Sequence, residues 1–482
     1  MTRRHSRRGR LATLAAAMTI ALGAVAACHG DSLLNADDPD LISPADIDNP
    51  DGAAGLRLGA LSRLRDMTGG TGGSGESPWL YSGLLADEYT SSSTFAQNDE
   101  TDKRTIQTSN SIVTGHFRDY FRTRTAAMQA TLLLRKWLPN NKADIAEMFF
   151  VKGFSELSLA QDFCNGIPLS SIVSSNIAVD SIVYGEPLPV AQVFQAAAAS
   201  FDSAFAILGT DTTAAANKRV FTASRIGKAR ALLANARTAA EYQAASALVL
   251  GIPTGFGYAV TFVVGTGDNA VWTFTTSNNR YSIGDSVEGN ARNLLVKNAI
   301  PFLSAKDPRL PANYVTRTTG TRVDTTKGQD GLTYVRVQSR YARSDSMLIV
   351  SGIDARLLEA EAQLAAGNSA GYLTTMNALR TGPTRVSNGI NISGMAALTD
   401  PGTPDGRIDQ FFRERAFWTF GRGQRLNDLR RLVRNYGRQP VDVFPNGPFH
   451  KGGSYGSDMN FPIPQVELNN PNVHASCIDR NA

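Results

Sequence analysis

The sequence feature that most constrains the fold is a pair of similar alanine-rich stretches, each about 28 residues long. Residues 223–250 and 353–380 each show the apolar periodicity of a helix, a short break and a second helix. Small residues recur where the two helices must approach closely, which is typical of tetratricopeptide-like hairpins, although the full signature of that repeat is absent. One such hairpin cannot bury its apolar face alone, so we expect neighbouring hairpins to stack into a mostly α-helical body.

Further helices are predicted from apolar residues that recur at helical spacing. They cover 55–66, 115–138, 143–162, 190–208 and 408–436. Pro139 follows the second of these helices, and Pro189 stands at the start of the fourth, where proline is favoured. We expect the helices at 143–162 and 190–208 to pack together as a further pair.

Residues 252–338 are rich in Gly, Thr, Asn and aromatic side chains, with alternating runs that predict short strands and long loops. Binding residues concentrate on long loops that a rigid scaffold carries. The predicted architecture is therefore one domain over residues 51–482. It consists of tetratricopeptide-like helical hairpins that form one α-helical body, with long loop and short-strand insertions, the main one at about 252–338.

Residues 1–27 have the order of a signal peptide. Five arginines precede an uncharged apolar run at 11–24, and small residues then lead into Cys28. A cysteine at the cleavage point predicts a lipoprotein whose lipid anchor is Cys28, with residues 28–50 as a polar tether. The alternative is an ordinary secretory signal with a chance cysteine. The pair Arg7-Arg8 partly matches a twin-arginine signal, which leaves the export route open.

Charge excludes several partners once the signal peptide is removed. The chain has 48 basic and 43 acidic residues, a net charge of +5. The five arginines of the signal account for that excess, so no basic surface for nucleic acid is expected on the mature part. No later stretch approaches the ~18 apolar residues of a membrane-spanning helix. We expect membrane attachment through the lipid only.

The mature part contains two more cysteines, Cys164 and Cys477. An even pair in an exported protein forms a disulfide or remains as two buried thiols, and the sequence leaves both alternatives open. Neither cysteine has the spacing of a zinc site, so we predict no metal and no cofactor.

Catalytic motifs are not supported. Residues 452–456 match the Gly-x-Ser-x-Gly elbow of hydrolases, but their neighbours are Pro/Gly-rich, and only His474 follows. No dinucleotide, phosphate or calcium loop has the required spacing. Paired glycosidase carboxylates are a spatial arrangement that sequence does not reveal. We therefore expect a binding protein, with an unmarked surface hydrolase as an alternative.

Four groups of residues, spread in order over nearly the whole mature chain, carry a family resemblance. They are Leu33-Leu34-Asn35 with Asp38-Pro39; Gln161-Asp162-Phe163 leading to Ile167-Pro168-Leu169; Ala355-Arg356-Leu357-Leu358-Glu359-Ala360 leading to Asn377-Ala378-Leu379-Arg380; and Glu414-Arg415, Gly421, Arg425 and Asp428-Leu429-Arg430-Arg431 with Phe461-Pro462-Ile463-Pro464. Together they resemble the SusD/RagB family of nutrient-binding outer-membrane lipoproteins. Phe117 stands where many relatives show a tryptophan, which indicates a divergent subgroup.

The resemblance implies a protein on the outer face of the outer membrane. There it would cap a TonB-dependent, SusC-like transporter and deliver a ligand, often an oligosaccharide, into it. Peptide cargo is an alternative, as is a helical-repeat scaffold that binds only proteins. The charged motif residues Glu414, Arg415, Arg425 and Asp428 are expected to hold the fold rather than to contact ligand, because charged side chains at helical spacing usually pair with neighbours.

Two groups of loop residues are candidates for ligand contact, since sugar capture needs aromatic faces beside hydrogen-bonding side chains. The first comprises Trp79, Tyr81 and Tyr89, and the second comprises Trp272, Asn279 and Tyr281. For each aromatic residue, burial in the core is the alternative. Trp137 and Trp418 fall on predicted helices, and we assign both to the core.

Overall fold

The computed structural model describes residues 47–71, 75–172, 182–209, 211–288, 290 and 292–482. Residues Asn49–Ala482 form one compact unit. The predicted signal peptide, the lipid anchor Cys28 and residues 28–46 of the tether lie outside the described part of the chain.

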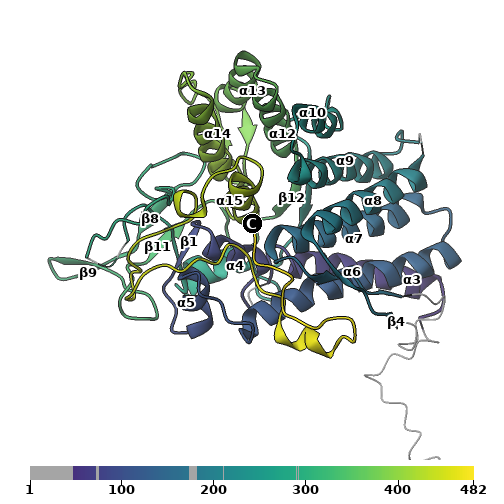
Figure 1. The fold of residues 1–482 in the computed structure, drawn as a ribbon, viewed down its shortest axis with the longest axis horizontal. Coiled ribbons are helices and arrows are strands. Elements are labelled where there is room, and N and C mark those ends of the chain that lie inside the picture. The colour runs from purple at the N-terminus through teal and green to yellow at the C-terminus, as the bar shows by residue number, and fades with distance from the viewer. Residues whose placement is uncertain (1–46, 72–74, 173–181, 210, 289, 291) are drawn as a thin grey trace, which may run out of the picture. The chain divides into compact units, whose positions relative to one another are not determined.

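Helices dominate this unit, as predicted, and successive ones pack against each other (Figure 1). The main series is α3 (Pro50–Asp66), α6 (Ser111–Trp137), α7 (Lys142–Asp162), α8 (Val190–Leu208), α9 (Ala215–Asn235), α10 (Ala239–Ala247), α12 (Gly352–Ala365) and α13 (Ser369–Thr381). The two predicted hairpins are α9–α10 and α12–α13, and they stack because α10 packs on α12. The prediction of stacked helical hairpins is therefore confirmed.

Local sequence explains where the hairpin helices start and how closely they pack. Thr238 and Glu241 form a reciprocal capping box that begins α10, so the break predicted near Thr238 satisfies orphan backbone N–H groups. Ser351 and Asp354 begin α12 in the same way. The predicted pairing of α7 with α8 is also confirmed, and Gly153 permits it, because a Cβ there would lie 3.0 Å from Ser200 Cβ.

One helix corrects the expectation that no later segment suits a membrane crossing. Among the residues that the structure covers, α8 is the one helix whose length and apolar composition would allow it to cross a membrane. However, Val193, Phe194 and Phe201 are buried, and α8 packs against α7 and α9. Its apolar character thus fits a core helix that neighbours cover on two sides.

The helix predicted at 408–436 is instead two helices, α14 (Pro404–Thr419) and α15 (Arg425–Arg434). The chain turns between them at Gly421 and Gly423, whose φ angles are 72° and 61°. A left-handed backbone is unfavourable for residues with a Cβ and does not continue a right-handed helix. The glycine pair therefore ends α14 and lets α15 leave in a new direction.

The charged motif residues hold the fold, as predicted. Arg415 donates to Asp428 at 2.7 Å, and Arg425 pairs with Asp87 at 2.7 Å. Glu414 accepts from Arg309 at 2.6 Å. These side chains are buried; the first pair ties α14 to α15, and the other two tie these helices to segments far away in sequence. Removing one partner of such a pair would leave a buried charge uncompensated.

The insertion forms short antiparallel pairs of strands, as predicted, and some pair with segments outside it. The strands are β1 (Tyr89–Ser91) with β7 (Tyr281–Ile283), β6 (Gly257–Val260) with β12 (Met347–Ser351), β8 (Ala312–Tyr314) with β11 (Arg336–Gln338), and β9 (Thr316–Thr319) with β10 (Arg322–Thr325). Shorter pairs are β2 (Ile167–Pro168) with β5 (Pro187–Leu188), β3 (Ser171–Ile172) with β4 (Ile182–Val183), and β13 (Thr384–Arg385) with β14 (Asn391–Ile392).

Cys164 and Cys477 form a disulfide, with their Cα atoms 6.0 Å apart. Of the two alternatives that the sequence leaves open, the structure therefore has the bridge. Cys164 directly follows the end of α7, and its N–H donates to the Phe461 carbonyl at 2.9 Å. The bridge and this hydrogen bond hold the C-terminal segment against the helical body.

Candidate functional site

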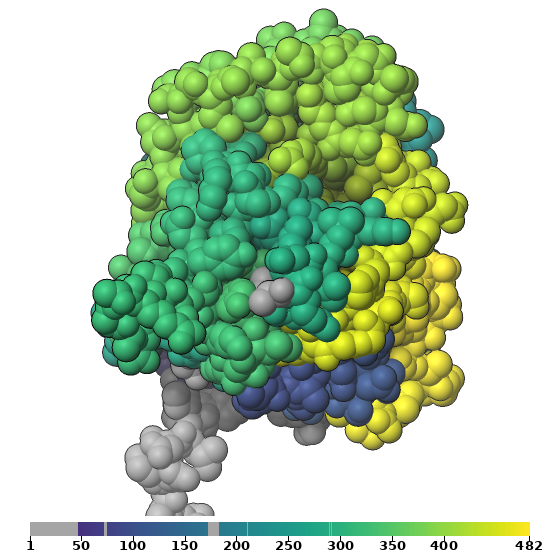
Figure 2. All heavy atoms as spheres, turned by 90° about the vertical axis from the view of Figure 1, so that its left-hand side faces the viewer, coloured from purple at the N-terminus to yellow at the C-terminus, as the bar shows by residue number. Residues whose placement is uncertain are grey.

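The pairing of β1 with β7 brings the two predicted groups of ligand residues together, although about 190 residues separate them in sequence. Ser91 lies opposite Tyr281 in the register. Beyond the strand, the Ser92 N–H donates to the Arg280 carbonyl at 3.0 Å, and Ser92 Oγ donates to the Asn279 carbonyl at 2.8 Å. We call residues 91–95 and 272–280 the paired-turn site. Figure 2 shows the side of the molecule on which the teal and green insertion borders the yellow C-terminal segment.

Four predicted ligand residues belong to the core and not to the surface. Trp79, Tyr81, Tyr89 and Tyr281 are each at most 2% exposed. Trp79 and Tyr81 lie on α4 (Pro78–Leu85), a helix that is buried on all sides. Tyr89 and Tyr281 point inward from the paired strands, 6.4 Å apart by ring centroids. The prediction of ligand contact is therefore wrong at these four positions, because their rings are packed in the core.

Of the two tryptophans that the sequence assigned to the core, one is buried and the other is exposed. Trp418 is fully buried, which confirms its assignment. Trp137 is 39% exposed at the end of α6, so its assignment to the core is wrong. It lies in the last turn of the helix, where the body no longer covers the side chain.

Phe95 is the exposed aromatic of the paired-turn site, with 45% of its surface accessible. The Arg280 guanidinium carbon lies 4.6 Å from its ring centroid and 5.1 Å from that of Phe274. Arg280 also forms an ion pair with Glu76. Sequence reasoning missed Phe95, although an apolar residue directly after the polar run 91–94 was a usable signal.

The backbone beside Phe95 is irregular. The short helix α11 (Ala270–Trp272) runs into a π-helical turn, η2 (Thr273–Ser277). Asn279 then adopts a positive φ of 51°, and no donor among the described residues reaches its buried Oδ1. Gln329 supports this turn by donating to the Asn278 carbonyl at 3.1 Å. Both π-turns and left-handed non-glycine residues concentrate at functional sites.

Trp272 keeps part of its ring accessible at the other end of the site. The Arg343 guanidinium carbon lies 5.5 Å from the ring centroid, and Arg343 pairs with Asp268 at 2.9 Å. Of the six predicted ligand residues, only Trp272 and Asn279 are not fully buried.

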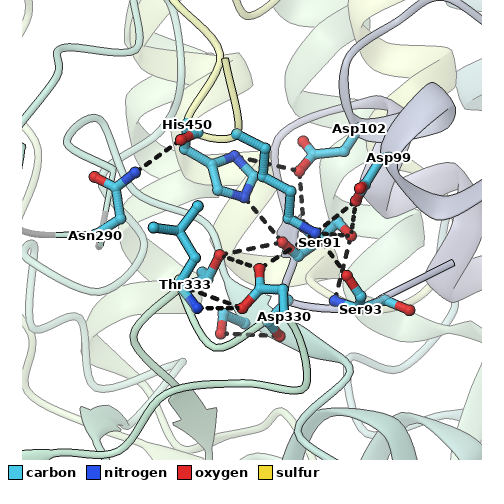
Figure 3. Close-up of polar contacts among 12 residues, drawn as sticks. Ser91, Ser93, Asp99, Asp102, Asn290, Asp330, Thr333 and His450 are labelled. Atoms are coloured by element: carbon cyan, nitrogen blue, oxygen red, sulfur yellow. Dashed lines mark hydrogen bonds and ion pairs between the residues drawn. The ribbon is translucent and has the colours of Figure 1, made fainter. Parts of the chain in front are cut away.

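A polar cluster at the 91–95 turn includes Ser93, Asp99 and Asp330 (Figure 3), and Lys451 contacts all three. Lys451 Nζ donates to the Ser93 carbonyl at 2.7 Å, to Asp99 at 2.6 Å and to Asp330 at 3.2 Å. Next to it, His450 Nε2 donates to the Ser91 carbonyl at 2.9 Å. Four segments of the chain therefore meet at this turn.

Two groups in this cluster have strongly perturbed acidity. Burial raises the pKa of Asp102 to about 8, and burial lowers the pKa of His450 to about 3. Both groups are therefore mainly uncharged at pH 7. Their Oδ2 and Nδ1 atoms lie 3.9 Å apart, too far for a hydrogen bond.

The Gly-x-Ser-x-Gly match has no catalytic geometry. Ser454 pairs with Pro448 in a short turn, and neither a strand before it nor a helix after it is present in this part of the structure. Nor does the described chain hold a group of three or more His, Cys, Asp or Glu side chains that suits a metal ion. What the described chain does place together at the paired-turn site is one exposed ring, Phe95, near an amide, hydroxyls and paired charges.

A cavity of 340 Å³ lies apart from this site, lined among others by Leu58, Glu147, Arg219 and Tyr258. Its buried carboxylate, Glu147, already accepts from Arg219 at 2.7 Å and from Tyr258 at 2.8 Å. These partners satisfy Glu147, so this carboxylate is not free to bind a ligand in the cavity.

Comparison with solved structures shows the same fold in proteins of very different sequence. A SusD-like carbohydrate-binding protein from Bacteroides fragilis matches with a TM-score of 0.59 and 13% identity over 89% of this chain and 99% of its own. A SusD/RagB family protein from Bacteroides thetaiotaomicron matches with a TM-score of 0.59 and 12% identity over 87% and 94%. A SusD-like carbohydrate-binding protein from Bacteroides vulgatus gives 0.57 and 11% over 89% and 98%. By sequence alone, neither a protein-family model nor a curated protein matches the chain.

Proposed function

We propose that this chain, which has the fold of the SusD/RagB proteins, is a divergent member of that family that captures an oligosaccharide at the paired-turn site. It binds its ligand and does not transform it. Support comes from the similar fold of two carbohydrate-binding proteins and from the exposed, polar-framed Phe95. Aromatic side chains of this kind stack on the apolar faces of sugar rings, while amides and hydroxyls bond their hydroxyl groups.

The proposal includes a place in the cell. Residues 1–27 direct export, lipid on Cys28 anchors the protein in the outer membrane, and the tether 28–50 lets residues 51–482 face outside as one domain. There the protein passes its ligand to a TonB-dependent, SusC-like transporter. The lipoprotein signal in the sequence and the shared fold support this part.

Charges at the site favour a neutral glycan over a charged peptide. Arg280, Arg343 and Lys451 are the cations that contact its rings and turns, and each already pairs with a carboxylate. A ligand that carries charge would have to compete with these pairs, whereas a hydroxyl-rich ligand would not.

The observation that carries the proposal is the exposed Phe95 ring beside Arg280, and substitution tests it. A glycan and peptide array on the soluble chain from Asp31 onward should show binding to one class of neutral glycan. Phe95→Ala and Trp272→Ala should each weaken that binding about tenfold or more, the range expected for losing one stacked ring. Trp137→Ala removes an exposed ring at the end of α6 and should leave binding unchanged.

Two other outcomes would redirect the assignment. Binding of peptides alone, lost in Phe95→Ala, would keep the site but change its cargo. A folded protein that binds neither class would favour a scaffold that recognises only protein partners. Turnover of a bound glycan would contradict the assignment as a binding protein.

A further inference from the structure

We infer that Lys451, a residue of the C-terminal segment, is a positioning residue for the ligand site: it holds the turn that presents Phe95 in its binding arrangement. This inference rests on the proposed function. Lys451 comes from a segment more than 350 residues after Phe95, and its side chain is only 12% exposed. It therefore acts through the turn and not by touching ligand.

The ammonium group joins two elements of the site directly. On the 91–95 turn, Nζ donates to the Ser93 carbonyl at 2.7 Å and lies 3.3 Å from Ser91 Oγ. Ser93 Oγ in turn accepts from the Phe95 N–H at 3.1 Å. On α5 (Ala96–Asp102), which starts directly after Phe95, Nζ reaches Asp99 at 2.6 Å. The cation thus fixes the chain on both sides of Phe95.

The same ammonium group fixes the loop that supports Asn279. Nζ pairs with Asp330 at 3.2 Å, and the Asp330 N–H donates to the Ser92 carbonyl at 3.2 Å. The neighbouring residue Gln329 bonds the Asn278 carbonyl. One charge therefore joins the 91–95 turn to the loop that supports the 278–280 turn, and both turns carry residues of the proposed ligand site.

Contacts of the neighbouring residue His450 hold the backbone next to Lys451 in place. The adjacent His450 is buried and donates to the Ser91 carbonyl, and the His450 carbonyl accepts from Asn290 at 2.8 Å (Figure 3). Because the backbone at this position is held independently, loss of the Lys451 charge should loosen the turn without releasing the C-terminal segment. A binding loop that is no longer preorganised must be ordered during binding, and this cost lowers the affinity.

The test compares Lys451→Met with a matched substitution elsewhere. Lys152 in α7 also bonds a carboxylate and a serine, Glu156 at 2.8 Å and Ser200 at 2.7 Å, remote in sequence from the site. Lys152→Met therefore removes a similar set of contacts. Calorimetric titration with neutral gluco-, manno-, xylo- and galacto-oligosaccharides is done on the chain from Asp31 onward, at a temperature where every variant is folded.

Lys451→Met should weaken binding by about tenfold, Lys451→Arg should recover most of the loss, and Lys152→Met should bind like the wild type. Hydrogen exchange should speed up at residues 91–97 in Lys451→Met only. Equal weakening by Lys152→Met would indicate general destabilisation and overturn the inference. Wild-type affinity in Lys451→Met, with binding still lost in Phe95→Ala, would overturn the inference alone. If the wild type binds no oligosaccharide, the proposed function fails, and the inference fails with it.

Discussion

Glu88 is a buried carboxyl, next to β1, whose surroundings favour its neutral form. The Gly421 N–H donates to Oε1 at 2.9 Å, whereas no donor within the described chain reaches Oε2. Burial raises the pKa of Glu88 to about 8 from its ordinary value of 4.5. The unfolded chain therefore releases this proton near pH 4.5, and the folded protein keeps it until about pH 8. The contribution of Glu88 to stability is full below pH 4.5 and is lost as the pH rises towards 8.

Glu88→Gln should remove this pH dependence, because glutamine keeps the shape and stays neutral. We expect the variant to gain stability over the wild type as the pH rises from 5 to 8, by up to about 1.4 kcal/mol per pH unit. Urea unfolding at several pH values measures the difference. Glu186→Gln, at an exposed position, is the control and should change stability by less than about 0.5 kcal/mol throughout. A parallel pH profile for wild type and Glu88→Gln would contradict the assignment.

At the residue scale, two of the six residues predicted for ligand contact belong to the proposed paired-turn site. Trp272 and Asn279 are partly buried, and the sequence pointed to them because turn residues and a tryptophan in a loop are recognisable locally. Tyr89 and Tyr281 were misassigned, since the inward face of a three-residue strand depends on its distant partner. Phe95 was missed although it follows a polar run, because its contact with Arg280 comes from a part of the chain that is distant in sequence.

The turn between α14 and α15 depends on Gly423. Its φ of 61° is unfavourable for any residue with a Cβ, and a Cβ there would lie 2.1 Å from Trp79 Cδ1. Gly423→Ala should therefore lower the free energy of unfolding by about 2–4 kcal/mol, through backbone strain and overpacking together. Guanidinium unfolding followed by far-UV circular dichroism measures the loss.

Gly389 offers the matched comparison for this substitution. It is exposed, and a Cβ there meets no atom within 4 Å. Gly389→Ala should leave stability unchanged within about 0.5 kcal/mol. If both substitutions had the same small effect, the turn would have to accommodate a side chain by moving away from Trp79.

At the element scale, helices were predictable and long-range pairings were not. The hairpins α9–α10 and α12–α13 follow from local periodicity and from caps such as Thr238, which a short window of sequence contains. The helix break at Gly421 also has a local cause. However, the apolar periodicity continues across it, so the sequence predicted one helix. The pairing of β1 with β7 has no local signal, because loops of very different length can join the same two strands.

At the scale of the whole molecule, the helical series forms the scaffold, and the insertion contributes segments of the proposed site. Buried ion pairs such as Arg425–Asp87 fasten α15 to the segment that leads into β1, and hence to the paired-turn site. The residues of the proposed ligand site lie on short irregular segments, such as the π-helical turn η2 and the 278–280 turn. A rigid scaffold that positions adaptable loops is a common solution for recognition, and it lets ligand preference change without loss of the fold.

The disulfide between Cys164 and Cys477 closes a loop with a sequence separation of 313. Because so long a closure restricts the unfolded chain strongly, reduction should lower the free energy of unfolding by about 2–5 kcal/mol. Guanidinium unfolding with and without a phosphine reductant measures the change, and the double variant Cys164→Ser/Cys477→Ser should be insensitive to reductant. Limited proteolysis should cut the reduced protein first within 465–482, where the bridge holds the tail against the end of α7. Equal stability in both redox states would show that Phe461 and its neighbours hold the tail without the bridge.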